Sequence, residues 1–74
     1  GQGVDLSLVA LDGNIKEIIA RKDTYPSPSE AVFAVVRNLI PYGLSKKQMI
    51  EFLSIHEVGT KGKDYTPDIE RIID

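Results

Sequence analysis

The chain has 74 residues, no cysteine and a formal net charge of −2, with 42% hydrophobic and 27% charged residues. This composition is that of one small globular domain and excludes a disordered segment. The lack of cysteine excludes disulfides and thiolate metal sites and favours a reducing, cytoplasmic location. The net charge excludes a surface that attracts nucleic acid over its whole extent, but it is compatible with a local basic patch. No apolar run reaches the ~18 residues that span a bilayer, so no membrane partner is expected.

Residues 1–13 give no clear element. Four apolar residues would share one helical face: Val4, Leu8, Leu11 and Ile15. The turn-forming pair Asp12-Gly13 interrupts that face. We expect residues 1–13 to form an arm or linker, which is either a helical turn or two or an extended segment.

A helix is predicted over about residues 14–22. Ile15, Ile18 and Ile19 have helical spacing. Asn14 precedes them and can cap the helix, with Glu17 three residues later.

The stretch YPSPSEAVFAVV, from Tyr25 to Val36, predicts a second and central helix over about residues 28–40. Ser27 and Glu30 have the spacing of a capping box, and Pro28 falls at the first helical position, where its missing N–H is not needed. The valines that follow also favour a strand, but the apolar pattern continues to Ile40, which is long for one. Because such a helix is apolar on most sides, we expect its neighbours to surround it.

Two further helices are predicted after the central one. Gly43 can end the central helix in the left-handed conformation, and Ser45 and Gln48 form a second capping box for a helix over about 46–54. Thr66-Pro67 repeats the pattern of a cap followed by proline, before a last helix that carries apolar residues at helical spacing. The sequence therefore predicts an all-α fold: residues 14–74 form a single orthogonal bundle of about four short helices.

Catalytic and metal sites find no support in the sequence. The single histidine, His56, follows a helix end, whereas a zinc site needs three or four protein ligands. The segment Gly59-Thr60-Lys61-Gly62-Lys63 resembles a phosphate-binding loop but lacks its G-x-x-x-x-G-K-[ST] spacing, which favours a flexible charged loop. We expect no enzyme activity in this chain, no metal and no cofactor.

Basic residues give a lead towards nucleic acid. In proteins that bind single-stranded nucleic acid, lysine and arginine contact phosphates and tyrosine stacks on bases. We predict that the phosphate contacts here are Arg37, Lys46, Lys47, Lys61 and Lys63. Tyr65 is the predicted stacking residue. The helix, Gly-containing turn and helix between Ser27 and Leu53 is also compatible with a helix-turn-helix, with Lys46 and Lys47 at the front of a recognition helix. Equally, the same lysines are compatible with a solvated helix start.

The most specific pattern in the chain is YPSPSEAVFAVV followed by Leu39-Ile40, Gly43-Leu44-Ser45 and Ile50. It resembles the pattern Y-x-S-x-S-E-A-x-F-A-x-V-x-x-L-(I/V)-x-x-G-x-(S/D)-x-x-x-I of a helical, primase C-terminal-type domain in DNA primase–polymerase replication proteins of phages, plasmids and other mobile genetic elements. The basic segment from Lys61 to Tyr65, followed by Ile69 and Ile72, is similar to the end of that domain. The resemblance covers roughly residues 14–74.

The resemblance implies an excised, non-catalytic accessory domain of a replication protein. Such a domain would contact template DNA, single-stranded in preference to duplex, or a nucleotide, and would join the primase–polymerase and helicase modules as its neighbouring partners. Two alternatives stay open. The bundle is a protein–protein docking module, which the acidic net charge favours, or it is a helix-turn-helix domain that binds duplex DNA.

Overall fold

The computed structural model describes residues 5–73, and these contain helices but no strand. There are five α-helices and two short 3-10 helices, in the order α1 (Leu6–Val9), α2 (Gly13–Ala20), η1 (Lys22–Thr24), α3 (Pro28–Leu39), η2 (Ile40–Tyr42), α4 (Lys46–Ile55) and α5 (Thr66–Ile73). The predicted all-α fold is confirmed, and the strand alternative for the YPSPSEAVFAVV segment is wrong.

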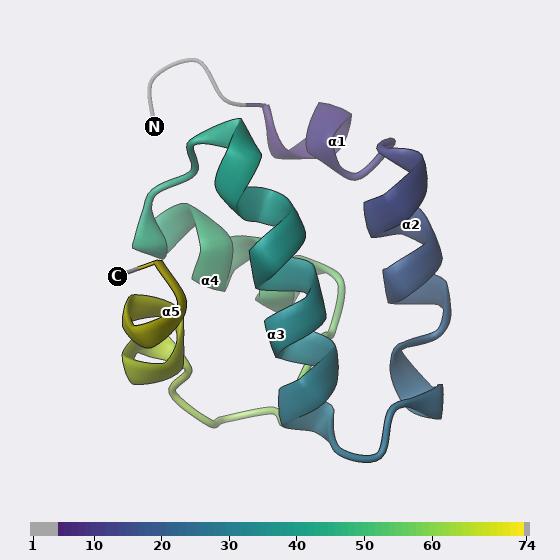
Figure 1. The fold of residues 1–74 in the computed structure, drawn as a ribbon, viewed down its shortest axis with the longest axis vertical. Helices are drawn as coiled ribbons and strands as arrows, with labels where there is room; N and C mark the ends of the chain where they lie inside the picture. The colour runs from purple at the N-terminus through teal and green to yellow at the C-terminus, as the bar shows by residue number, and fades with distance from the viewer. Residues whose placement is uncertain (1–4, 74) are drawn as a thin grey trace.

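Helix α3 is the centre of the bundle and contacts α2, α4 and α5 (Figure 1). Ser27 caps it as predicted, because its Oγ accepts a hydrogen bond from the Glu30 N–H at 3.4 Å, and Pro28 occupies the first turn. Among the described residues the Glu30 carboxylate makes no return bond, so only half of the capping box forms. The buried side chains repeat at helical spacing; they are Ala31, Val32, Val35, Val36 and Leu39.

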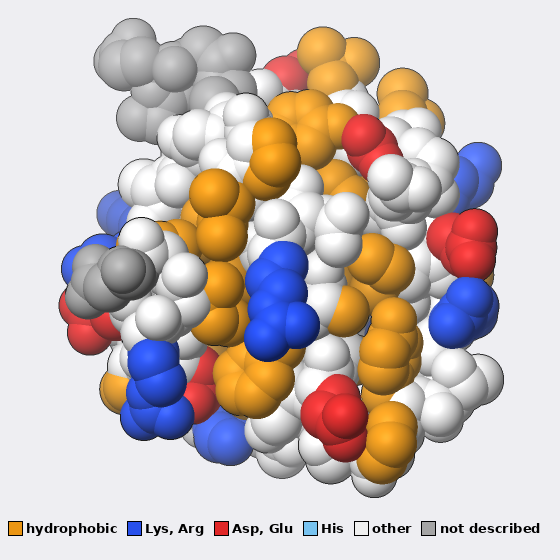
Figure 2. Space-filling model, viewed as in Figure 1, with side chains coloured by type: hydrophobic (Ala, Val, Ile, Leu, Met, Phe, Trp, Pro, Cys, Tyr) orange, Lys and Arg blue, Asp and Glu red, His pale blue; other side chains and the backbone are white. Residues whose placement is uncertain are grey.

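One side of α3 faces solvent, which corrects the prediction that its neighbours surround it. Glu30 and Arg37, seven residues apart and therefore on one helical face, are both exposed. In Figure 1 α2 and α5 flank α3 while the side towards the viewer is uncovered, and Figure 2 shows charged and hydrophobic side chains mixed over it. Helix α3 is thus amphipathic, with a wide apolar stripe and a narrow polar one.

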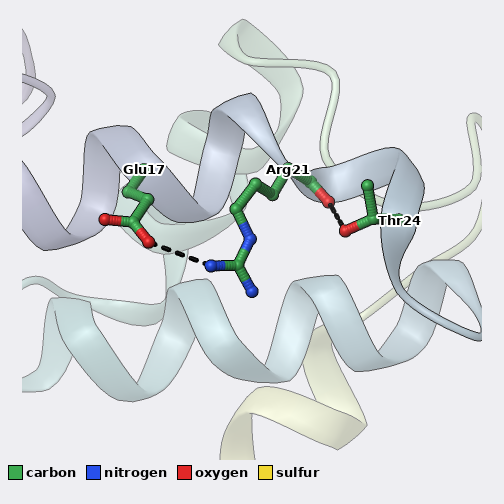
Figure 3. Close-up of polar contacts among 3 residues, drawn as sticks. All are labelled: Glu17, Arg21 and Thr24. Atoms are coloured by element: carbon green, nitrogen blue, oxygen red, sulfur yellow. Dashed lines mark hydrogen bonds and ion pairs between the residues drawn. The ribbon is translucent and has the colours of Figure 1, made fainter.

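Helix α2 begins earlier than predicted because Asp12, and not Asn14, is its N-cap. The Asp12 carboxylate accepts hydrogen bonds from the N–H groups of Asn14 at 2.9 Å and Ile15 at 3.2 Å. Beyond its C-terminus the Arg21 side chain donates back to Glu17 and the Thr24 hydroxyl donates to the Arg21 carbonyl, which leads the chain into η1 (Figure 3).

The connection between α3 and α4 follows the prediction closely. Ile40 and Pro41 tighten into the 3-10 helix η2, and Gly43 ends it with a φ of +72°. The Ser45–Gln48 capping box is complete: the Ser45 Oγ accepts from the Gln48 N–H at 3.1 Å, and the Gln48 side chain accepts from the Ser45 N–H at 2.9 Å.

Helix α5 begins at Thr66 itself, and the Thr66 N–H donates a hydrogen bond to the Asp64 carboxylate.

The N-terminal segment packs on the bundle through a single turn of helix. Val9 of α1 is buried in the common core, while Leu8 and Leu11 are 65% and 70% exposed. Leu8 and Leu11 thus do not share the buried side of Ile15, as expected from the interruption at Asp12-Gly13, and Val4 lies outside the described residues. The division into an arm at 1–13 and a bundle at 14–74 stays a prediction. No helix in residues 5–73 is long and apolar enough to cross a membrane.

Candidate nucleic-acid interface

A hollow of about 620 Å³ opens between α4 and the loop that leads to α5; we call it the loop hollow. Its floor is apolar, because the buried side chains of Leu53, Val58 and Tyr65 line it. Ile50 and Ser54 of α4 line one wall and residues 59–64, which we call the basic loop, line the other. The hollow thus joins one face of α4 to a polar, charged loop.

Tyr65 anchors the basic loop at both ends, because it directly follows the loop in the chain and its ring and hydroxyl contact the first two loop residues. At its start, Gly59 has a φ of +92°, and a Cβ there would lie 2.6 Å from Val32 Cγ2 and 2.7 Å from Tyr65 Cε2. The next residue, Thr60, donates its N–H to the Tyr65 Oη at 2.6 Å. Only glycine fits against the tyrosine ring in this conformation, so the loop begins at a fixed point on the core.

The end of α4 directs the chain into this loop through a Schellman motif. The Val58 N–H bonds the Leu53 carbonyl at 2.8 Å and the Glu57 N–H bonds the Ser54 carbonyl at 3.2 Å. Glu57 has the left-handed φ of +54° that this motif requires. The Glu57 carbonyl also accepts from the Lys22 Nζ at 3.0 Å, which ties the turn to η1.

Two of the predicted contact residues, Lys61 and Lys63, lie on the basic loop and are exposed. The Lys63 Nζ lies 4.9 Å from the centre of the Tyr65 ring and 3.3 Å from the Ser29 Oγ. Lys63 therefore lies at the N-terminal end of α3 as well as beside the hollow. Both lysines are exposed residues on a loop that begins against the core at Gly59 and ends at the buried Tyr65.

The other three predicted basic residues are distributed over α3 and α4. Lys46, in the first turn of α4, forms a 2.7 Å ion pair with Glu70 of α5. Lys47 is exposed and shares a helical face with Ile50 and Ser54, so it lies on the side of α4 that lines the hollow. Arg37 is exposed in the last turn of α3, about 12 Å along the helix from Ser29, since each residue rises about 1.5 Å. Arg37 is therefore not brought beside Lys63.

Tyr65 is a core residue, with 5% of its surface exposed. Its hydroxyl is bonded to Thr60 and its ring contributes to the floor of the hollow. Little of the ring is left for stacking on a base, so its predicted stacking role does not fit this placement. Its position as the anchor of the basic loop was not foreseen, because only the folded chain brings its ring against Gly59.

Acidic groups share the lining of the hollow. Asp64 lies beside Lys63 in the chain, and its hydrogen bond from Thr66 lowers the pKa of the Asp64 carboxyl. Glu57 lines the hollow as well. The two carboxylates offset the charges of Lys61 and Lys63, while Lys22 adds a positive charge behind Glu57.

The described residues contain no group of histidine, cysteine or acidic side chains that could hold a metal ion. The His56 ring packs against Phe52, with 4.5 Å between ring centres. Comparison with models of protein families, with curated proteins and with solved structures gave no match. No relative therefore assigns a ligand to this surface.

Proposed function

We propose that this chain is a non-catalytic accessory domain of a DNA primase or related replication protein, and that it contacts single-stranded template DNA through the basic loop. The observation that carries the proposal is the pair of exposed lysines, Lys61 and Lys63, on an anchored loop beside an apolar hollow. Lysines at such a position bind phosphates, and a loop that is already ordered loses little entropy when it binds.

Single-stranded DNA is a better ligand for this surface than duplex. A helix-turn-helix protein needs the front of its second helix free to enter the major groove. Here Lys46 at the front of α4 is paired with Glu70 of α5, and the exposed Glu51 adds a negative charge to the same helix. The basic loop, in contrast, lies beside an opening that a flexible strand can enter and a rigid duplex cannot.

The wider role follows from the resemblance of the YPSPSEAVFAVV segment. The domain would lie between a primase–polymerase module and a helicase module and would hold the template for the former. Catalytic carboxylates and a phosphate-binding loop would then belong to those neighbouring modules, which are also its protein partners.

A salt-dependent titration tests the proposal. Binding of the 74-residue chain to a labelled single strand and to a duplex is measured at low and moderate salt. We expect single-strand binding that weakens with salt and falls about tenfold when both Lys61 and Lys63 are changed to alanine, since each phosphate contact releases counterions.

The matched control is the double change of Lys16 and Arg21 to alanine, which removes one positive charge from α2 and one from the residue that follows it. The Arg21–Glu17 pair in Figure 3 is well exposed, with 59% and 65% of the side chains accessible, so its loss changes stability little. This control should keep the single-strand affinity. Failure of the unmodified chain to bind a single strand at low salt would refute the proposal.

A second function, docking of a neighbouring protein domain, is favoured by one observation. Among residues 5–73, Leu8 and Leu11 are the most exposed large apolar residues, and the bond between Asp12 and Tyr42 brings the exposed Tyr42 to the same end of the bundle. Apolar surface of this kind often lies at interfaces. In the full-length parent protein, Leu11→Ser should then speed proteolysis between modules without changing single-strand binding; unchanged proteolysis would exclude this docking role.

A further inference from the structure

We infer that the loop hollow receives one base of the bound single strand, with Lys61 and Lys63 holding the phosphates beside it. This inference rests on the proposed function and deepens it. The hollow measures about 620 Å³, and pockets for small organic ligands are roughly 300–1,000 Å³. A surface that bound phosphates alone would need no such opening.

The lining suits a nucleobase because it combines an apolar floor with a polar rim. Ile50, 37% exposed, presents its side chain beside the buried Leu53 and Val58, and a base has two flat faces of low polarity that such side chains can contact. The hydroxyl-bearing Ser54 and Thr60 also line the hollow. A hydroxyl both donates and accepts hydrogen bonds, so these two residues can bind the edge of any base. The site should therefore tolerate different sequences.

The charges around the hollow point to the same conclusion. Glu57 and Asp64 share the lining with Lys61 and Lys63, so the two carboxylates offset part of the attraction of the lysines for a phosphate chain. Burial of a base would add to that attraction, with each lysine acting on a nearby phosphate. Affinity should consequently depend on the presence of bases, and not only on the number of phosphates.

The hollow exists before any ligand binds. The Gly59–Tyr65 contact fixes the start of the basic loop, and the Schellman motif at Glu57 fixes the end of α4. A preformed opening avoids the cost of ordering its walls on binding.

The test compares an eight-nucleotide oligothymidine with an oligomer of the same length and charge in which every base is absent. We expect the 74-residue chain to bind the oligothymidine about tenfold more tightly, which is the size of effect that contact with a single base produces in single-strand binders. Ile50→Ser, which removes an apolar side chain from the lining of the hollow, should reduce that preference. Ile55→Ser on the same helix, at an exposed position outside the hollow, is the matched control and should keep it.

The outcomes separate the two proposals. Equal binding of both oligomers, reduced by the loss of Lys61 and Lys63, would overturn base insertion and leave the proposed function standing. Binding to neither oligomer at low salt would overturn both. A thermal unfolding curve of each variant confirms that it is folded, and Ile50→Ser and Ile55→Ser replace side chains that are already partly exposed, so both are expected to fold.

Discussion

Tyr42 and Asp12 are joined by a hydrogen bond that the tyrosine Oη donates to the aspartate carboxylate. The two residues come from different parts of the chain: Asp12 caps α2, and Tyr42 ends the 3-10 helix after α3. One carboxylate therefore begins α2 and also holds the far end of α3 against it. This contact lies at the end of the bundle where the exposed leucines of the N-terminal segment are found.

Stability should depend on pH through this pair. The bond from Tyr42 is the main reason that the pKa of Asp12 falls below 3.8, and the bond to Asp12 raises the pKa of Tyr42 above 10.0. A lowered carboxyl pKa contributes stability that is present above the unfolded value and is lost as pH falls through the folded value. The raised tyrosine pKa contributes stability that is present below pH 10 and lost above it.

We therefore expect Tyr42→Phe to be less stable than the unmodified chain at pH 7 and to lose less stability when the pH is lowered below 3.8. Urea unfolding at neutral and acidic pH measures this difference. Identical pH dependence of the two proteins would show that the hydrogen bond does not shift the Asp12 pKa.

Gly59→Ala should destabilise the fold by about 3 kcal/mol. About 1–2 kcal/mol comes from the left-handed backbone conformation and a similar amount from overlap with Val32 and Tyr65, whose atoms lie 2.6 Å and 2.7 Å from the new Cβ. The matched control is Gly62→Ala, at a φ of +86° with open space around the Cβ position, which should lose only the backbone part. Chemical unfolding of both variants measures the difference, and equal losses would mean that the contact with Tyr65 contributes nothing.

Glu57→Gly should stabilise the chain by about 1 kcal/mol. Glu57 occupies the position of the Schellman motif that glycine usually fills, at a φ of +54°, and a side chain there costs about 1–2 kcal/mol. Part of the gain is offset because glycine is more flexible in the unfolded chain. Glu51→Gly, inside α4, is the control and should destabilise by about 1 kcal/mol. A loss of stability in Glu57→Gly, measured by thermal or urea unfolding, would contradict this explanation of the turn.

The local signals that predicted the fold are those that act over a few residues. Ser27, Ser45 and Gln48 bond backbone groups three positions away, and Gly43 supplies a conformation that its neighbours would adopt only with strain. Such bonds can be inferred from spacing alone. The prediction of Asn14 as the cap of α2 was wrong because Asp12-Gly13 was interpreted as a turn, whereas the Asp12 carboxylate accepts from the N–H groups of Asn14 and Ile15.

The candidate site was predicted in part, because its lysines are visible in the sequence and its shape is not. Lys61 and Lys63 were named from composition, whereas the hollow beside them depends on Ile50 and Ser54 of α4 facing a loop several residues further on. The sequence did not reveal that the Tyr65 ring is buried, because its burial depends on Gly59 and Val32 coming together in space. Tyr65 was therefore predicted to stack on a base. These contacts lie outside any helical repeat, and the Gly59–Val32 contact joins two distant segments, so no periodicity in one sequence encodes them.

Asp64→Asn should strengthen binding of a single strand about threefold at low salt, and the gain should shrink as salt is added. The exposed carboxylate of Asp64 follows Lys63 in the chain and shares the lining of the hollow with both lysines, and charge pairs of this kind are worth about 0.2–1 kcal/mol before screening. The cap of α5 is kept, because the asparagine oxygen still accepts the Thr66 N–H that Asp64 binds at 2.9 Å. Asp5→Asn is the matched control: Asp5 makes the equivalent 2.9 Å bond to the Ser7 N–H, and its loss of charge at α1 should leave single-strand affinity unchanged. If both variants bind more tightly to the same extent, net charge and not the basic loop governs the affinity.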